Sequence, residues 1–200
     1  MSVDRGTDPS MEQSWVEQTQ KSDLEGFSKI VDAYQVRVYG FVRRMVRNDE
    51  DAQDVTQDVF VRAFQAIHKF DHRSSLRTWL FRIAYHLCVD LARRVDRSPK
   101  ISALESGTED EAPREFADRR WDPAEILMNQ ELQVVVEHAL ETMSDKLRTV
   151  IVLHDREDLG YEEIAQVVNV PIGTVKSRLF LARAHMQESV GRYLEGGRNP

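Results

Sequence analysis

Hydroxyls and long cations gather in residues 161–183, which read YEEIAQVVNVPIGTVKSRLFLAR. Ile164, Ala165 and Val168 recur at helical spacing, and Pro171 stands where a second helix can begin. Proline suits the first turn of a helix because the amide that it lacks would be unpaired there. The stretch therefore predicts a helix-turn-helix.

The second of these helices carries the side chains with binding chemistry. Its buried stripe is predicted at Val175, Leu179 and Ala182. Its outer faces hold Thr174, Lys176, Ser177, Arg178 and Phe180. Cations there reach phosphates or guanine edges in the major groove, and the helix N-terminus itself favours phosphate. The pattern favours binding of duplex DNA over the alternative of an ordinary helical hairpin with a solvated basic face.

A second basic segment lies at residues 76–94. Its predicted core stripe is Leu76, Trp79, Leu80, Ile83, Leu87 and Leu91. Its outward cations are Arg77, Arg82, His86, Arg93 and Arg94. Phe81 and Tyr85 lie among them, and rings beside Arg suit single-stranded nucleic acid because bases stack on the rings. The residues leave open the alternative that Phe81 and Tyr85 complete a core, where large aromatics tend to lie.

A strip of carboxylates and amides follows one face of the helix predicted at residues 51–67. The buried face of that helix is predicted at Ala52, Val55, Val59, Ala63 and Ile67. The strip consists of Asp54, Gln57, Asp58, Val61 and Gln65. Taken alone, such a strip favours a solvated face over a docking surface, since charged side chains are mostly exposed. Asp49 or Asp51 is expected to cap the helix.

No arrangement of residue types indicates catalysis. The sequence shows no paired carboxylates, no nucleophile–base set and no glycine-rich phosphate loop. His68 and His72 are close in sequence, but a metal site needs three or four converging ligands. The single cysteine, Cys88, excludes an internal disulfide and is predicted to be a small core residue rather than a redox sensor. We therefore expect a protein that is not an enzyme and that uses no cofactor or metal.

Composition favours two small helical cores in the cytosol. A hydrophobic content of 41% over 200 residues is ample for packed helices, and no apolar run is long enough to span a bilayer or to form a signal-peptide core. A net charge of −7 opposes nucleic-acid binding overall. The acids concentrate between the two basic segments, however, and local basic faces bind DNA even on an acidic chain.

These elements predict an all-α fold of two helical domains joined by a flexible acidic linker, with no strands. The predicted parts are a flexible arm at 1–22, a first domain at 23–95, the linker at 96–123, a second domain at 124–194 and a tail at 195–200. In the second domain, Asp122 and Pro123 are expected to begin one helix and Ser144 to cap the next. The linker is interpreted as a solvated spacer, the alternative being that it competes with DNA for basic surfaces.

Three motifs together carry a family resemblance. They are DAQDVTQDVFVRAF at 51–64, FDHRSSLRTWLFRIAYHLCVDLARR at 70–94 and the helix-turn-helix at 161–183. In this order they resemble regions two and four of bacterial sigma factors, specifically the extracytoplasmic-function (ECF) group. The resemblance covers most of residues 24–94 and 126–190. It implies an alternative sigma factor that binds core RNA polymerase and directs promoter-specific initiation; the alternative is a stand-alone helix-turn-helix regulator.

The resemblance also assigns roles to individual residues. Contacts with the polymerase β′ clamp coiled coil are implied for Asp54, Gln57, Asp58 and Val61. Recognition of the −10 element, with capture of a flipped base by the loop at 71–75, is implied for Asp71, His72, Arg73, Ser74, Ser75, Arg77, Trp79, Arg82 and His86. Binding of the −35 element is implied for Tyr161, Glu162, Thr174, Lys176, Ser177, Arg178, Phe180 and Arg183.

Three positions depart from the family pattern. His72 stands where glycine is common, His86 where asparagine is frequent and Leu181 where arginine or lysine is frequent. The first two put the −10 base preference in question, and the third removes one phosphate contact. The implied partners are core RNA polymerase (β′ coiled coil and β flap), promoter DNA and an anti-sigma factor that clamps both domains. A nucleoid-associated, cytoplasmic protein without direct membrane insertion is expected, to be held at a membrane only through an anti-sigma factor.

Overall fold

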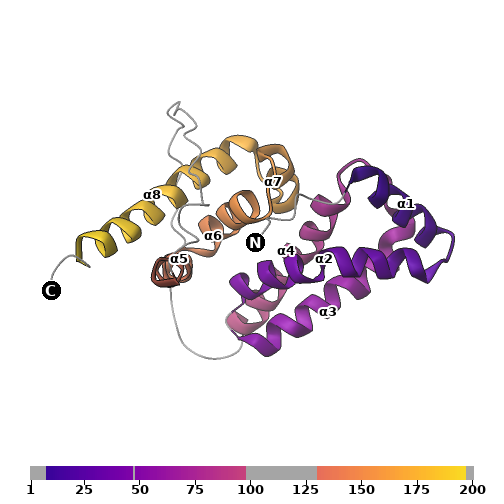
Figure 1. Ribbon diagram of the computed structural model, residues 1–200, viewed down its shortest axis with the longest axis horizontal. Helices are drawn as coiled ribbons and strands as arrows, with labels where there is room; N and C mark the ends of the chain where they lie inside the picture. Colours follow the sequence, from indigo (N-terminus) through magenta and orange to yellow (C-terminus); the bar gives the residue numbers. More distant parts are fainter. Residues whose placement is uncertain (1–7, 47, 98–129, 197–200) are drawn as a thin grey trace. The chain divides into compact units, whose positions relative to one another are not determined.

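The computed structural model describes residues 8–46, 48–97 and 130–196, which form helices and their connecting turns without a strand (Figure 1). Two compact units account for them. The first holds α1 to α4, and the second holds α5, α6, α8 and the start of α7. The prediction of an all-α fold in two helical domains is confirmed. Of the predicted acidic linker at 96–123, only residues 96 and 97, in the last turn of α4, lie within the described residues.

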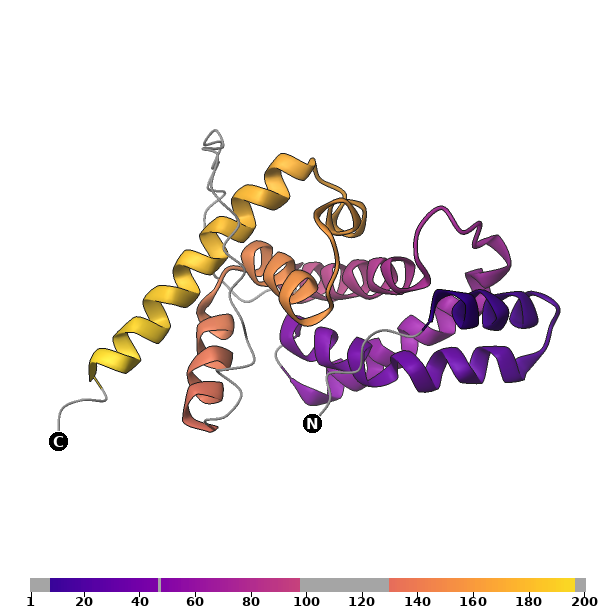
Figure 2. The ribbon, with the colours of Figure 1, turned by 45° about the horizontal axis from the view of Figure 1, so that its top comes forward.

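The first unit consists of α1 (Pro9–Gln20), α2 (Leu24–Met45), α3 (Asp49–Ala66), the short 3₁₀ turn η1 (Ile67–Lys69) and α4 (Leu76–Arg97). α2 packs against the other three long helices (Figure 2). The core contains Ile30, Val38 and Phe41 of α2 with Leu80 and Phe81 of α4, none of them exposed. The Phe41 and Phe81 rings meet edge to face at 5.5 Å. Phe81 is thus a core residue, which settles one alternative that the sequence left open.

The prediction of a flexible arm at 1–22 is wrong for residues 9–20, which form α1. Asp8 caps this helix by accepting a hydrogen bond from the Ser10 amide at 2.9 Å. α1 lies so close to α2 that a Cβ on Gly26 would sit 2.6 Å from the Trp15 carbonyl oxygen. The sequence signal was weak because α1 buries only Val16 and Thr19. Tertiary packing, rather than an apolar stripe of its own, holds the helix in place.

The cap of α3 also differs from the prediction of Asp49 or Asp51. Asn48 is the N-cap, and its Oδ1 accepts a hydrogen bond from the Asp51 amide at 2.7 Å. Asp49 and Asp51 instead lie in the first turn, where negative charge favours the positive end of the helix dipole.

The helices at residues 130–196 are α5 (Gln130–Thr142), α6 (Asp145–Ile151), the π-helical turn η3 (Val152–Arg156), α7 (Tyr161–Val168) and α8 (Ile172–Gly196). α8 packs against α5 and α6. The predicted start at Asp122 and Pro123 lies outside the described residues. Ser144 is the N-cap of α6 as predicted, but its side chain makes no capping bond. Polar ties join the elements: Arg156 to Glu137 at 3.5 Å, and the Thr142 hydroxyl to His185 Nε2 at 3.1 Å.

Candidate polymerase and nucleic-acid interfaces

The strip on α3 lies on the face opposite the core. Asp54, Gln57, Asp58 and Val61 are all exposed and follow the three- and four-residue steps of one helix face. Asp54 and Asp58 are one turn apart, and like charges at that spacing do not stabilise a helix. The strip therefore makes no evident contribution to folding, which leaves its side chains available for a partner.

An apolar patch continues this strip toward the end of α3. Val61 is 53% exposed and Phe64 is 39% exposed. The Phe64 ring meets Phe27 of α2 edge to face at 5.0 Å, so the aromatic side chain is held in place while part of it faces solvent. Carboxylates beside fixed apolar side chains suit a protein partner, because burial of the apolar part supplies affinity and the charges supply orientation.

The loop at residues 71–75 joins η1 to α4 and is anchored at both ends. At its start, Phe70 is buried and packs on Trp79 at a centroid distance of 5.2 Å. At its end, Ser75 caps α4: its Oγ accepts the Thr78 amide at 3.1 Å. His72 has φ of 59°, in the left-handed region where glycine is free of strain. The glycine common at this position in the resembled family thus has a conformational explanation.

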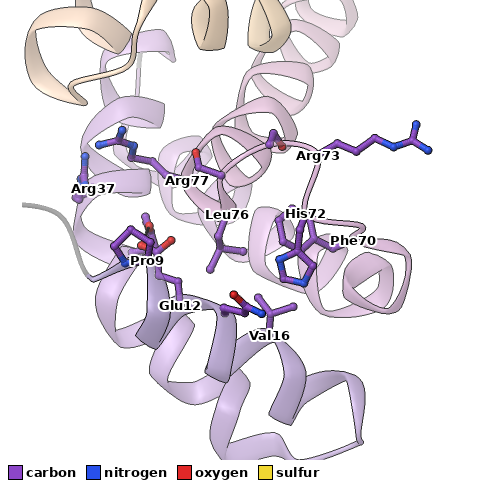
Figure 3. Close-up of a pocket in the computed structure, with 13 residues that line it drawn as sticks. Pro9, Glu12, Val16, Arg37, Phe70, His72, Arg73, Leu76 and Arg77 are labelled. Carbon is purple, nitrogen blue, oxygen red and sulfur yellow. Dashed lines mark hydrogen bonds between the residues drawn. The ribbon is translucent and has the colours of Figure 1, made fainter.

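A cavity of about 620 Å³ lies beneath this loop, within the range of roughly 300–1,000 Å³ typical of ligand pockets. Its walls come from α1, α2, the loop and the start of α4 (Figure 3). The lining residues from the loop and α4 are His72, Arg73, Ser74, Ser75, Leu76 and Arg77. In Figure 3 the Arg73 side chain extends away from the others, and it forms an ion pair with Asp71 at 2.8 Å. The cavity brings the predicted loop residues together with helices that the sequence did not connect to them.

The opposite wall holds residues that the sequence analysis missed, namely Glu12 of α1 with Tyr34 and Arg37 of α2. The Tyr34 hydroxyl donates a hydrogen bond to Glu12 Oε1. Burial raises the pKa of Glu12, while the Tyr34 bond and the positive charges of Arg77 and Arg37 partly oppose the rise. Burial and the Glu12 carboxylate also raise the pKa of Tyr34. Two sequence signals could have located this wall: Asp8 followed by Pro9, which is typical of a helix start, and the buried stripe of α2, which includes Tyr34.

Arg77 lines the cavity, and the other predicted −10 residues on α4 divide into two groups. Arg82 and His86 are exposed, and His86 Nδ1 donates to the Arg82 carbonyl oxygen at 2.6 Å. Trp79 is only 8% exposed and packs on Phe70, so the structure places it under the loop rather than on the binding surface. A large ring on the core stripe of an amphipathic helix lies inward, and Trp79 supports the loop through Phe70. Tyr85 is half-buried beside His86, at a centroid distance of 5.7 Å.

The helix-turn-helix forms where the sequence predicts it. Asn169 ends α7 with φ of 52°, and the Val170 amide donates to the Ala165 carbonyl oxygen at 3.2 Å. This pattern is a Schellman-type stop, for which asparagine is tolerated. The Pro171 carbonyl then accepts the amides of Thr174 and Val175, at 3.0 and 3.2 Å. Pro171 thus directly precedes α8, which begins at Ile172.

The predicted −35 residues are exposed or half-exposed, and Arg183 alone among them is engaged in an ion pair with η3. Lys176 is exposed and its ammonium lies 6.0 Å from the centre of the Tyr161 ring, which links α8 to α7. Phe180 is 45% exposed. Glu162 is exposed, and Thr174, Ser177 and Arg178 are half-exposed. These side chains present hydroxyls, cations and one ring to solvent, which suits contacts with phosphates and base edges.

Arg183 is the exception. It pairs with Asp155 of η3 at 3.6 Å, and its side chain is 23% exposed. Burial raises the pKa of Asp155, and the Arg183 charge opposes the rise. The ion pair of Arg183 with Asp155 thus joins α8 to η3. Removing either partner would leave the other charge half-buried and uncompensated, which is destabilising. Its prediction as a DNA contact is not supported by this placement.

Other expected features concern Cys88, metals and membranes. Burial raises the pKa of the Cys88 thiol from its usual 9.0 to about 12, which agrees with the core role predicted for it. Within residues 8–46, 48–97 and 130–196, no three His, Cys, Asp or Glu side chains gather into a group that can hold a metal ion. No helix in the described part of the chain combines the length and apolarity needed to cross a bilayer.

Comparison with known proteins adds two family matches and several relatives. The Sigma-70 region 2 family matches residues 30–98, and the Sigma-70, region 4 family matches residues 133–186. The chain is 33% identical over 177 residues to the ECF RNA polymerase sigma factor SigW of Bacillus subtilis, covering 88% of this chain and 94% of SigW. It is 33% identical over 184 residues to the ECF RNA polymerase sigma-E factor of Escherichia coli K12, covering 90% and 94%.

Two solved structures share the fold over most of the chain. CnrH, solved in complex with the cytosolic domain of CnrY, matches with a TM-score of 0.65 and 25% identity, covering 90% of this chain and 97% of that one. The sigma factor RpoE of Bartonella quintana, solved with the anti-sigma factor NepR, matches with a TM-score of 0.59 and 24% identity, covering 82% and 96%.

Proposed function

Since the chain belongs to the ECF group of RNA polymerase sigma factors, we propose that its two helical units hold the two ends of a promoter on behalf of the polymerase. The protein is an alternative sigma factor, and its family consists of non-catalytic transcription initiation factors. The observation that carries the proposal is the order of two sigma regions on one chain, each with an exposed helix face of suitable chemistry.

The proposed polymerase contact is the face of α3 with Asp54, Gln57, Asp58 and Val61. It would dock on the coiled coil of the β′ clamp, and the second unit would contact the β flap. The exposure of the four side chains and the adjoining patch at Val61 and Phe64 support this assignment. Electrostatic complementarity across such a contact chiefly sets orientation and the rate of association.

The proposed −10 contact is the loop at 71–75 with the cavity beneath it. Extruding a base from the duplex costs a few kcal/mol, which stacking and phosphate contacts must offset. The cavity offers aromatic and apolar walls for the base, and Arg82 and His86 line the exposed face of α4 beyond the loop. The N-terminal half of α8 is proposed to enter the major groove of the −35 element, with Lys176 and Arg178 among its contacts.

We further propose an anti-sigma partner in the cytoplasm or at the membrane, which would cover the polymerase- and DNA-binding faces until it is released. The related RpoE of Bartonella quintana was solved with the anti-sigma factor NepR. Without such control, a sigma factor would redirect polymerase continuously.

The rival function is a stand-alone helix-turn-helix regulator. This hypothesis explains the helix-turn-helix of α7 and α8 but assigns no function to the strip on α3. Selection from a randomised promoter pool with the full chain and core polymerase tests the choice. The sigma-factor proposal expects two enriched elements that appear only when core polymerase is present. A single element, enriched equally by the chain alone, would support the rival and overturn the proposal.

A further inference from the structure

The cavity beneath the loop has two chemically different ends. Its less polar end is formed by Val16, Phe70 and Leu76, with the His72 ring 4.8 Å from that of Phe70. Its polar end is formed by Glu12, Arg37 and Arg77 (Figure 3), and the Tyr34 hydroxyl is bonded to Glu12 there. A flat aromatic ligand with a polar edge fits this division, because its faces meet apolar side chains while its edge meets hydrogen-bonding groups. A nucleobase that enters beneath the loop has this shape.

Glu12 is held firmly at the polar end. α1 is locked against α2 by the close approach at Gly26, and Val16, one turn after Glu12, is 1% exposed. The Tyr34 hydroxyl bonds Oε1 of Glu12. Each carboxylate oxygen has two lone pairs, so Glu12 can accept further hydrogen bonds from a ligand while it keeps Tyr34. A fixed acceptor beside two arginines is the kind of arrangement that distinguishes one base edge from another.

Given the proposed capture of a flipped base, we propose that Glu12 is a specificity-determining residue. Its carboxylate accepts a hydrogen bond from the exocyclic amino group of that base and thereby selects cytosine over thymine. Cytosine presents an amino donor at one end of its Watson–Crick edge and a carbonyl acceptor at the other. The carboxylate therefore accepts a hydrogen bond from the amino group, and an arginine donates one to the carbonyl oxygen. Thymine presents carbonyl oxygens at both ends, so a carboxylate repels whichever end faces it.

The variants Glu12→Gln and Glu12→Ala test the proposed role of Glu12, because they differ in the hydrogen-bonding groups that they supply. A glutamine amide both donates and accepts, so it can donate to a thymine carbonyl where the carboxylate cannot. Glu12→Ala supplies neither group. The glutamine variant should therefore admit thymine, whereas the alanine variant should only lose the preference for cytosine. A purely structural role for Glu12 would not predict this difference between the two variants.

Two matched controls separate base reading from helix packing. Tyr34→Phe removes the hydrogen bond to Glu12 but leaves the carboxylate in the cavity. If Glu12 acts only by tying α1 to α2, this variant should alter promoter selection as Glu12→Gln does. Glu17→Gln makes the same chemical change on the same helix at an exposed position. Glu17→Gln is expected to keep the base ranking of the unaltered chain. Tyr34→Phe changes the lining of the cavity as well, but it adds no donor for a thymine carbonyl, so it is not expected to admit thymine as Glu12→Gln does.

The experiment uses the full chain bound to core polymerase and a promoter pool randomised across the −10 element. Open complexes are isolated and their DNA is sequenced. For the unaltered chain, one position should favour cytosine over thymine by roughly tenfold, the size of one good side-chain contact to a base. With Glu12→Gln, that ratio should fall about tenfold at this position alone, and with Glu12→Ala the position should become degenerate.

The outcomes distinguish this inference from the proposed function. If the unaltered chain enriches a −10 element but Glu12→Gln selects the same bases at every position, the inference is overturned and the proposed function stands. An equal shift with Tyr34→Phe also overturns the inference, because it would assign the effect to packing. If the unaltered chain enriches no −10 element at all, the proposed function itself fails.

Discussion

The side-chain amide of Gln20, at the end of α1, donates a hydrogen bond of 2.9 Å to the carbonyl oxygen of Ile67, which begins η1. The same amide lies 3.1 Å from the carbonyl oxygen of Phe70, the last residue before the loop. One side chain thus satisfies two backbone acceptors about 50 residues later in the sequence. α1 therefore helps to position the loop at 71–75.

We predict that Gln20→Ala lowers the free energy of unfolding by about 1–2 kcal/mol, because two hydrogen bonds are lost in a partly buried setting and the Ile67 carbonyl keeps only its bond from the Phe70 amide. It should also weaken promoter melting more than polymerase binding. Urea denaturation of the full chain measures the first effect. Gln65→Ala, at an exposed position on α3, is the control and should change stability by less than about 0.5 kcal/mol. Equal stability of the two variants would contradict the clamping role.

The backbone at His72 predicts a difference between two small substitutions. Both His72→Gly and His72→Ala remove the ring contact with Phe70, but only alanine keeps a Cβ at φ of 59°. A Cβ in the left-handed region costs roughly 1–2 kcal/mol, and glycine avoids this cost. Part of the resulting stabilisation is lost, because glycine also has greater conformational freedom in the unfolded chain. We therefore expect the glycine variant to be more stable by about 1 kcal/mol in thermal or urea denaturation. An alanine variant of equal or greater stability would show that the loop adopts another conformation.

The strip on α3 predicts a loss of polymerase binding without a loss of folding. Reversing the charges with Asp54→Lys and Asp58→Lys should leave the free energy of unfolding within about 0.5 kcal/mol, since both side chains are exposed. Affinity for core polymerase should fall roughly tenfold or more, because like-charge contacts at an interface are costly. Asp32→Lys, at an exposed position on α2, is the matched control. Unchanged affinity in the double variant would remove the strip from the interface.

The exposed cation at the start of α8 predicts a change in salt dependence. Lys176→Ala in the full chain with core polymerase should weaken binding to promoter duplex. It should also reduce the slope of log affinity against log salt by about one, as expected for one lost phosphate contact. Arg192→Ala is the control on the same helix, where Arg192 is engaged with Glu188 at 3.6 Å. A slope unchanged by Lys176→Ala, or reduced equally by Arg192→Ala, would contradict the proposed orientation of α8.

The sequence predicted those parts of the fold that depend on strong periodicity or on a specific stop signal. α4 carries a long apolar stripe, and Pro171 marks the start of α8, so the existence and type of these helices were readable. α1 was missed because it buries two side chains and depends on the surface of α2 for the rest. Its contribution to the cavity was therefore missed as well.

The candidate sites were predictable where exposure follows helix periodicity, and unpredictable where a distant partner decides. The exposure of the strip on α3 and of the outer face of α8 follows from spacing, whereas the docking role of the strip was implied only by the family resemblance. Arg183 looked like a DNA contact because its partner Asp155 lies 28 positions earlier, beyond any local pattern. Two expectations conflicted at Trp79: periodicity placed it on the core stripe, and the family resemblance implied a DNA contact. The structure shows the side chain buried, as periodicity predicted.

The central claim is that this chain opens promoter DNA only as part of a larger enzyme. Permanganate reactivity of unpaired thymines across the −10 element measures this directly on a promoter that the chain selects. The account predicts reactivity when the full chain and core polymerase are both present, and none with either alone. Reactive thymines with the chain alone, or tight promoter binding to which core polymerase adds no melting, would contradict it.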